Sequence, residues 1–252
     1  WQYKHKKMKK SVTVLMVSLF LMPVLAQHYK NFSVSLYCTA RDVSQMGDTA
    51  GFLLPRWNEI TRQLKVDKVY LETHRDMLIV NQNTLDLAKK FFSDRGVRIA
   101  GGITYPVKEA DHFRTFCYND PEDRKMVQEI AEYTARNFGE FILDDFFFTN
   151  CKTDDAIKDK GNRSWTQYRL ELMAEAAKSL VVEPAKKINP RVRVVIKYPN
   201  WYEHFQGLGF NLEKEPGTFD GLYTGTETRD AVLSEQHLQP YLGYTIFRYF
   251  EN

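Results

Sequence analysis

Two adjacent carboxylates, Asp144 and Asp145, end an apolar run and are the first residues whose types and spacing suggest chemistry. The run at 141–143 (Phe-Ile-Leu) has the length and composition of a buried strand, and three phenylalanines follow the acids. Acids beside aromatic rings suit a site that protonates or attacks a sugar while a ring stacks on its apolar face. The plainer interpretation is that the two acids end a strand and solvate a turn.

Side-chain alternation predicts which of the two acids faces the site. Neighbouring strand residues point to opposite faces, so only one acid can face inward. We expect that acid to be Asp145, because Leu143 and Asp145 share one side of the strand and Phe147 continues it. A bulge after Leu143 would exchange the two acids.

The elements that would position these acids recur along the chain. Apolar strands are predicted at 32–37, 66–71, 97–104, 141–143, 192–196, 219–223 and 243–249, and amphipathic helices separate most of them. Strands that alternate with helices pair in parallel through right-handed crossovers. Seven such strands predict an α/β fold, a (β/α)8 TIM barrel truncated after its seventh strand.

A doubly wound open sheet is the competing architecture. It usually carries a glycine-rich phosphate loop after the first strand, whereas residues 37–42 (Tyr-Cys-Thr-Ala-Arg-Asp) contain no glycine. The sequence shows no internal repeat and no low-complexity linker. We therefore assign residues 27–252 to one barrel catalytic domain whose C-terminal part is missing.

In such a barrel, the residues that follow each strand face one end of the sheet, called the mouth below. Acids and aromatic residues gather at these positions, as a carbohydrate site requires. The predicted catalytic residues are Asp144, Asp145 and Glu227. The residues predicted to bind substrate are Glu72, His74, Tyr105, Lys197, Tyr198, Trp201, Arg229 and Asp230.

Several of these residues also have purely structural interpretations. Glu72 and Arg75 could form a surface ion pair, and a lone histidine such as His74 is more often a hydrogen-bonded structural residue than a catalyst. Lys197 follows a buried strand, and because lysine is rarely buried unless paired, we expect it to bind substrate hydroxyls or a carboxylate.

From the first strand to its end, the chain resembles secreted (β/α)8-barrel glycoside hydrolases. The resemblance rests on the segments 141–146 (Phe-Ile-Leu-Asp-Asp-Phe), 188–190 (Ile-Asn-Pro), 192–197 and 219–227. In the α-galactosidase-like barrels, an Asp that ends strand four is the nucleophile and an acid after strand six is the proton donor. The resemblance thus implies Asp144 or Asp145 as nucleophile and Glu227 or Asp230 as donor.

The chain departs from that pattern at one position. Those enzymes usually carry a lysine two residues before the nucleophile, whereas Ile142 and Leu143 precede the acids here and the lysine follows strand five as Lys197. Another large group of barrels uses an acid after strand four as proton donor and a Glu after strand seven as nucleophile. That arrangement would recruit Glu251.

The beginning of the chain predicts export. The basic residues at 8–10 precede an apolar stretch at 12–21 and small residues at 24–26, which together are typical of a secretory signal peptide. We therefore predict a leader and signal peptide at 1–26, and a mature protein that is secreted or periplasmic and has no membrane partner. The formal net charge is +3, and part of it comes from the leader, so the charge predicts no nucleic-acid partner.

Cysteines and histidines bear on disulfides and metals. Cys117 and Cys151 each follow a predicted strand in loops expected to be neighbours, which makes them the candidate disulfide pair, although three unpaired cysteines are an alternative. The six histidines form no metal-binding pair, so we predict no metal and no cofactor. Two other functions compete with the glycosidase: a non-catalytic carbohydrate-binding barrel and a metal-dependent hydrolase that uses Asp144 and Asp145.

Overall fold

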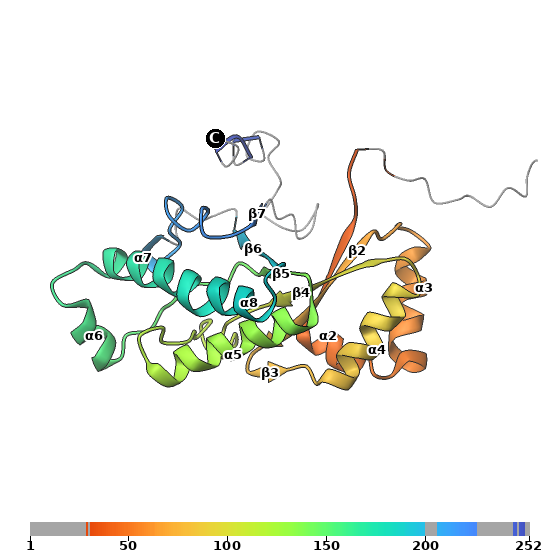
Figure 1. Ribbon diagram of the computed structural model, residues 1–252, viewed down its shortest axis with the longest axis horizontal. Helices are drawn as coiled ribbons and strands as arrows, with labels where there is room; N and C mark the ends of the chain where they lie inside the picture. The colour runs from red at the N-terminus through yellow and green to blue at the C-terminus, as the bar shows by residue number, and fades with distance from the viewer. Residues whose placement is uncertain (1–28, 30, 200–205, 226–243, 246, 250–252) are drawn as a thin grey trace, which may run out of the picture.

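The structure is a computed structural model, and it describes residues 29, 31–199, 206–225, 244–245 and 247–249. Figure 1 shows these residues coloured along the chain. The predicted leader at 1–26 lies outside the described residues. So do four predicted site residues, Trp201, Glu227, Arg229 and Asp230, together with Glu251.

The strands form one curled, largely parallel sheet. Its parallel strands are β1 (Ser35–Cys38), β2 (Lys68–Arg75), β4 (Arg98–Ile103), β5 (Glu140–Leu143), β6 (Arg193–Tyr198) and β7 (Gly221–Thr224), and they pair in this order. The short β3 (Leu78–Ile79) pairs antiparallel with β2. A doubly wound sheet reverses its strand order at a switch point, whereas this order follows the chain, as in a barrel.

Helices connect successive strands. They are α2 (Ala40–Gln45), α3 (Leu54–Thr61), α4 (Gln82–Ser93), α5 (Pro121–Asn137), α6 (Asp154–Lys160), α7 (Trp165–Ala176) and α8 (Glu183–Ile188). Before β7 the chain also contains two π-helical stretches (Thr49–Leu53 and Ala177–Val182) and a 3-10 turn (Gln206–Leu208). Asp120 caps α5 by accepting hydrogen bonds from the amides of Glu122 and Asp123.

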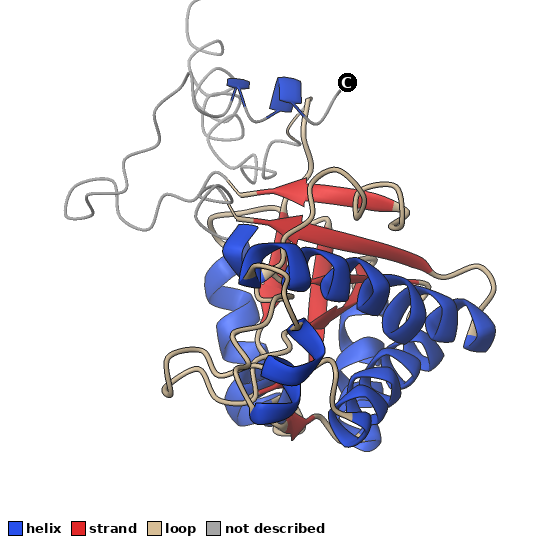
Figure 2. Ribbon diagram, turned by 90° about the vertical axis from the view of Figure 1, so that its left-hand side faces the viewer, coloured by secondary structure: helices blue, strands red, loops and turns tan. Residues whose placement is uncertain are grey.

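In the described structure the helices pack against one face of the sheet, which confirms the barrel-type fold. On β2, β4 and β5, alternate residues such as Val69, Ile103 and Leu143 enter the two large apolar clusters shared with the helices. The residues between them, including Tyr70 and Ile142, face the opposite side and form a separate small cluster. Figure 2 shows the strands as a curled sheet with the helices around its outer side.

One predicted segment differs from the structure. The seventh strand predicted at 243–249 is wrong, since the described residues 244–245 and 247–249 are helical. Elsewhere, the helical segment that begins at Trp165 changes type before Pro184. The π-helical stretch 177–182 alters the hydrogen-bonding pattern just before the proline, and α8 then continues to Ile188.

One disulfide joins two of the loops at the mouth. Cys117, in the loop after β4, is bonded to Cys151, in the loop after β5, which confirms the predicted pair. Cys38 carries a free thiol. No helix in the part of the chain that the structure describes has the length and apolar content to cross a membrane.

Candidate functional site

Strand alternation places Asp144, and not Asp145, on the inner face of the sheet. Ile142 belongs to the inner cluster, while Leu143 and Phe147 belong to the outer core shared with the helices. The prediction that the side of Leu143 faces the site is therefore wrong. Asp144 follows Ile142 at the end of β5 and projects from the same face.

Both acids nevertheless reach the same cation. Lys197, near the end of the neighbouring strand β6, donates from Nζ to Asp144 Oδ1 at 3.2 Å and to Asp145 Oδ2 at 3.0 Å. Asp145 can do so because the chain leaves the strand in a turn, where the Phe146 amide donates to the Asp144 carbonyl at 2.7 Å. The side chain of Asp145 is 7% exposed and that of Lys197 is 26% exposed, so the lysine is the more solvent-accessible residue of this pair.

A second cation, Arg75, approaches Asp144 from the other side. Its Nη2 donates to Asp144 Oδ2 at 3.2 Å and to Thr104 Oγ1 at 3.0 Å. Its other terminal nitrogen, Nη1, contacts Glu109 in the loop after β4. Asp144 thus lies between two cations that come from the strands on either side of the β4–β5 pair.

A β-bulge turns Arg75 toward the inner face. Glu72 pairs with Gly102 and His74 with Ile103, so Thr73 is an extra residue in β2. Thr73 hydrogen-bonds outward to Thr134 on α5 at 2.7 Å, and the strand alternation resumes one residue late. The turn that follows has positive φ at Asp76 (51°) and Met77 (62°), as a two-residue hairpin turn requires, and it ends β2 directly after Arg75.

Glu72 fixes the position of Arg75 through hydrogen bonds and an ion pair. Its fully buried carboxylate accepts hydrogen bonds from Arg75 Nε (2.8 Å), Tyr37 Oη (2.8 Å) and the Ala40 amide (2.6 Å), and it also accepts one from Thr104 Oγ1. Burial raises the pKa of Glu72, although Arg75, Thr104 and the Ala40 amide act in the opposite direction. Burial lowers the pKa of Arg75, but Glu72 and Glu109 outweigh it, so the net shift is upward.

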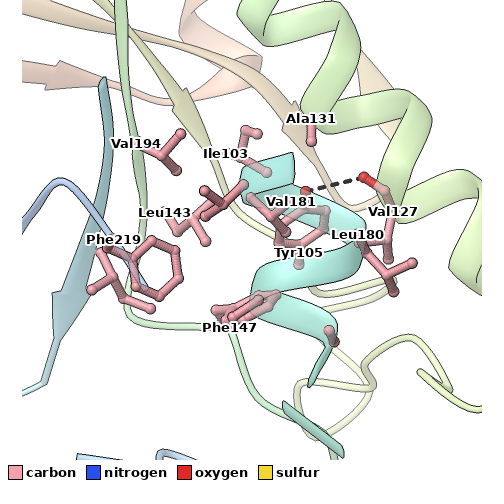
Figure 3. Packing of buried hydrophobic residues seen from close by; sticks show 14 of the residues in the cluster. Ile103, Tyr105, Val127, Ala131, Leu143, Phe147, Leu180, Val181, Val194 and Phe219 are labelled. Atoms are coloured by element: carbon pink, nitrogen blue, oxygen red, sulfur yellow. Dashed lines mark hydrogen bonds between the residues drawn. The ribbon is translucent and has the colours of Figure 1, made fainter. Parts of the chain in front are cut away.

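Three residues predicted to bind substrate lie in the outer core instead. The ring of Tyr105 is 1% exposed, and its hydroxyl donates to the Val127 carbonyl on α5 at 3.1 Å (Figure 3). Tyr198 is fully buried, and its hydroxyl donates to Glu215 at 3.3 Å. Both side chains follow the outward alternation of their strands and cannot stack on a ligand at the mouth.

His74 is the third of these residues. The Thr73 bulge turns it outward, where its ring lies near Tyr105 and Phe116. Its Nδ1 donates to the Thr104 carbonyl at 2.7 Å. Burial lowers the pKa of His74 to about 4, so the ring is neutral at physiological pH. The prediction that it binds substrate is therefore wrong, and the structural interpretation fits.

The structure brings together Glu72, Asp144, Asp145 and Lys197 from the predicted site. Sequence reasoning missed the contributions of Tyr37, Thr104 and Glu109, and it did not name Arg75 among the residues that bind substrate. Strand alternation could have identified Tyr37 and Thr104, because each lies on the inner face at the end of its strand. No group of three or more His, Cys, Asp or Glu side chains within the described ranges could hold a metal ion.

An apolar layer lies beneath the mouth. Tyr70, Ala100, Ile142 and Val195 come from four successive strands and pack together on the inner face. Below them, Lys68 forms an ion pair with Glu140, which also contacts Arg193. This layer separates the charges at the mouth from those at the opposite end of the sheet.

One family model matches most of the chain. A family model described as "Probable glycosyl hydrolase, catalytic domain" matches residues 22–252. An uncharacterized protein of Saccharolobus solfataricus, SSO3021, is 29% identical over an alignment of 229 residues, and the match covers 80% of this chain and 38% of that protein. The chain therefore spans less than half the length of this curated relative.

Solved structures of glycosidases resemble the chain more distantly. A β-glucosidase from Thermotoga maritima in complex with castanospermine shares 13% identity at a TM-score of 0.40, over 69% of this chain and 50% of that one. The β-glycosidase BGL167 shares 11% identity at a TM-score of 0.39, over 84% of this chain and 63% of that one.

Proposed function

Because the chain belongs to the family of probable glycosyl hydrolase catalytic domains, we propose that it hydrolyses glycosidic bonds of an oligo- or polysaccharide at the mouth of its sheet. The proposed site is built around Asp144, Asp145 and Lys197. The observation that carries this proposal is the meeting of two carboxylates from the end of β5 with one lysine from β6. Carbohydrate hydrolysis on such a barrel needs carboxylates at this end of the strands.

The contacts of Asp144 fix its carboxylate at the mouth. Two cations, Arg75 and Lys197, hydrogen-bond to its two oxygens, and Thr104 Oγ1 lies 3.4 Å from one of them. We assign Asp144 the role of nucleophile or of the base that activates water, and Asp145 the role of positioning Lys197.

A glycosidase also needs an acid that holds a proton until the leaving group takes it. Both acids at Lys197 hydrogen-bond to this lysine, so we propose that the donor comes from another segment. Glu227, predicted from the sequence and outside the described residues, is the candidate. Lys197 and Arg75, once contacted by substrate, would bind sugar hydroxyls beside Asp144.

The test changes each acid to its amide in separate variants: Asp144→Asn, Asp145→Asn and Glu227→Gln. Turnover of a panel of aryl glycosides and natural oligosaccharides is then measured. We expect Asp144→Asn and Glu227→Gln to lower kcat by at least about a thousandfold, and Asp145→Asn to have a smaller effect. Asp94→Asn is the matched control, because Asp94 is exposed and ends α4 at the opposite end of the sheet.

Circular dichroism and melting temperature confirm that each variant folds. If Asp144→Asn keeps near-normal turnover while folded, the assigned role is wrong. A wild-type protein that binds glycans but cleaves none would instead support the non-catalytic binding barrel.

A further inference from the structure

We propose that Phe113, stacked on Phe146, forms a sugar-binding subsite next to the acids at the mouth. This inference rests on the proposed function and adds to it where a second sugar unit of the substrate would lie. The ligand would be a pyranose ring whose hydroxyls are mostly equatorial, since such a ring presents C–H groups on its faces. Aromatic faces bind apolar surfaces of this kind.

The first observation is an aromatic ring left exposed beside the site. Phe113 is 43% exposed, and its ring lies parallel to that of Phe146, with centroids 5.1 Å apart and an interplanar angle of 16°. One face of Phe113 is therefore covered by Phe146, while the rest of the ring is open to solvent. Phe146 is half-buried, packs on the outer core and directly follows Asp145 in the chain.

The second observation is the backbone that presents this ring. His112 and Phe113 have φ values of 50° and 53°, which place two successive non-glycine residues in the left-handed region. Apart from Gly, Asn, Asp and His, residues rarely adopt this conformation, so Phe113 is the unusual one, and the conformation persists only where surrounding contacts enforce it. Such conformations concentrate at binding and catalytic sites.

The enforcing contacts come from the segment that carries the acids. Asn150 Nδ2 donates to the carbonyls of His112 (3.2 Å) and Phe113 (3.1 Å), while its Oδ1 accepts from Thr115 Oγ1 at 3.1 Å. The disulfide from Cys117 to Cys151 ties the same two loops immediately beyond these hydrogen bonds. The loop is thus fixed to the chain five residues after Asp145.

The other side of the loop is fixed to the arginine of the site. Glu109 forms an ion pair with Arg75, which hydrogen-bonds to Asp144, and the Glu109 amide donates to Asp76 Oδ1 at 2.8 Å. Within the loop, the Phe113 amide donates to the Glu109 carbonyl at 3.1 Å. Phe113 therefore belongs to the loop that contacts Arg75, the cation bonded to Asp144, and its ring stacks on the residue that follows Asp145.

The experiment compares Phe113→Ala, Phe113→Trp and the wild-type protein. Binding is measured by calorimetry with cello-, manno- and malto-oligosaccharides, and KM and kcat are measured on the same series. We expect Phe113→Ala to weaken binding of the longer oligosaccharides about tenfold, with KM rising more than kcat falls. Phe113→Trp, which keeps an aromatic face, should bind as well as the wild type or more tightly.

Phe32→Ala is the matched control. Phe32 is also exposed and stacked, on Tyr29 with centroids 4.3 Å apart, but it precedes β1 at the opposite end of the sheet. Its loss should leave oligosaccharide binding unchanged. A folded Phe113→Ala variant that binds oligosaccharides as tightly as the wild type would overturn the subsite while leaving the proposed function intact. If the wild-type protein neither binds nor cleaves any of these glycans, both the proposed function and the subsite are wrong.

Discussion

The buried carboxyl group of Glu215 makes the stability of the fold depend on pH in a direction that can be worked out. Glu215 is fully buried in the described structure, where Tyr198 Oη donates to its Oε2 at 3.3 Å. Its Oε1 has no hydrogen-bond partner among the described residues. Burial raises the pKa of Glu215 from 4.5 to about 8, against the smaller opposing effect of the Tyr198 hydrogen bond.

The direction of this pH dependence follows from the protonation of Glu215 in the folded and unfolded chains. In the unfolded chain Glu215 titrates near its ordinary pKa of 4.5, so at neutral pH the folded protein keeps a proton that the unfolded chain has released. The stabilising contribution is complete below the unfolded pKa and is lost as pH rises toward the folded pKa. Each pH unit in this window lowers the free energy of unfolding by about 1.4 kcal/mol, or roughly 3 kcal/mol over two units.

Glu215→Gln removes the titration and keeps an oxygen for Tyr198 to donate to. The free energy of unfolding of each protein is measured by urea denaturation. Between about pH 5 and about pH 7, we expect it to fall by roughly 3 kcal/mol more for the wild type than for Glu215→Gln. Glu129→Gln is the control, because that side chain is 55% exposed on α5 and should give no such trend. If the wild type and Glu215→Gln change in parallel across this range, Glu215 does not hold its proton in the folded state.

Two further predictions concern the Cys117–Cys151 disulfide and the close packing around Gly101. Changing both cysteines to Ser removes a cross-link between residues 34 apart in sequence and should lower the free energy of unfolding by roughly 3–4 kcal/mol. Equal stability of the wild type with and without reductant would contradict this. Gly101→Ala places a Cβ 2.6 Å from the Phe138 ring and should cost about 1–3 kcal/mol, measured by urea unfolding. Gly139→Ala, where a Cβ meets nothing within 4 Å, should cost little, and similar losses in both variants would refute the packing argument.

Sequence periodicity predicted the fold because each strand is an apolar run and most helices carry clear end signals. The capping Asp120 with Pro121 marked the start of α5, and the outer-face alternation on β6 is visible as Val194, Ile196 and Tyr198. The short α6 was missed because its sequence at 154–160 is almost entirely polar, so that only its cap, Thr153, indicates a helix. The seventh strand was predicted from apolar content alone, which does not separate a short strand from a helix.

The candidate site was predicted in its residue types but not in its orientations. The position of Asp144 depends on which face of β5 meets the helices, and the sequence 141–143 is apolar on both faces. Arg75 reaches the mouth only because of the bulge at Thr73. The residue types at 72–75 do not predict this bulge. Tyr105 and Tyr198 were assigned to the mouth by their place in the sequence, whereas strand alternation places both in the core.

The charges at the mouth bear on how a proton donor would be kept protonated there. Among the described residues, the ion pairs connect two cations, Arg75 and Lys197, with four carboxylates, Glu72, Glu109, Asp144 and Asp145, so this ionised set has a net charge of −2. The cations are already engaged by these acids. A further carboxyl group brought to the same mouth would therefore meet mainly negative charge.

Like charge and partial burial both favour the neutral form of such a group, and a neutral acid is what the leaving oxygen of a glycoside requires. The negative charge around Asp144 would thus hold an incoming acid as a proton donor. Two carboxyl groups can in this way take opposite roles at one site because their neighbours differ, without any difference in their own chemistry. For Glu227 this inference requires only that its side chain reach the mouth without forming an ion pair with Lys197 or Arg75.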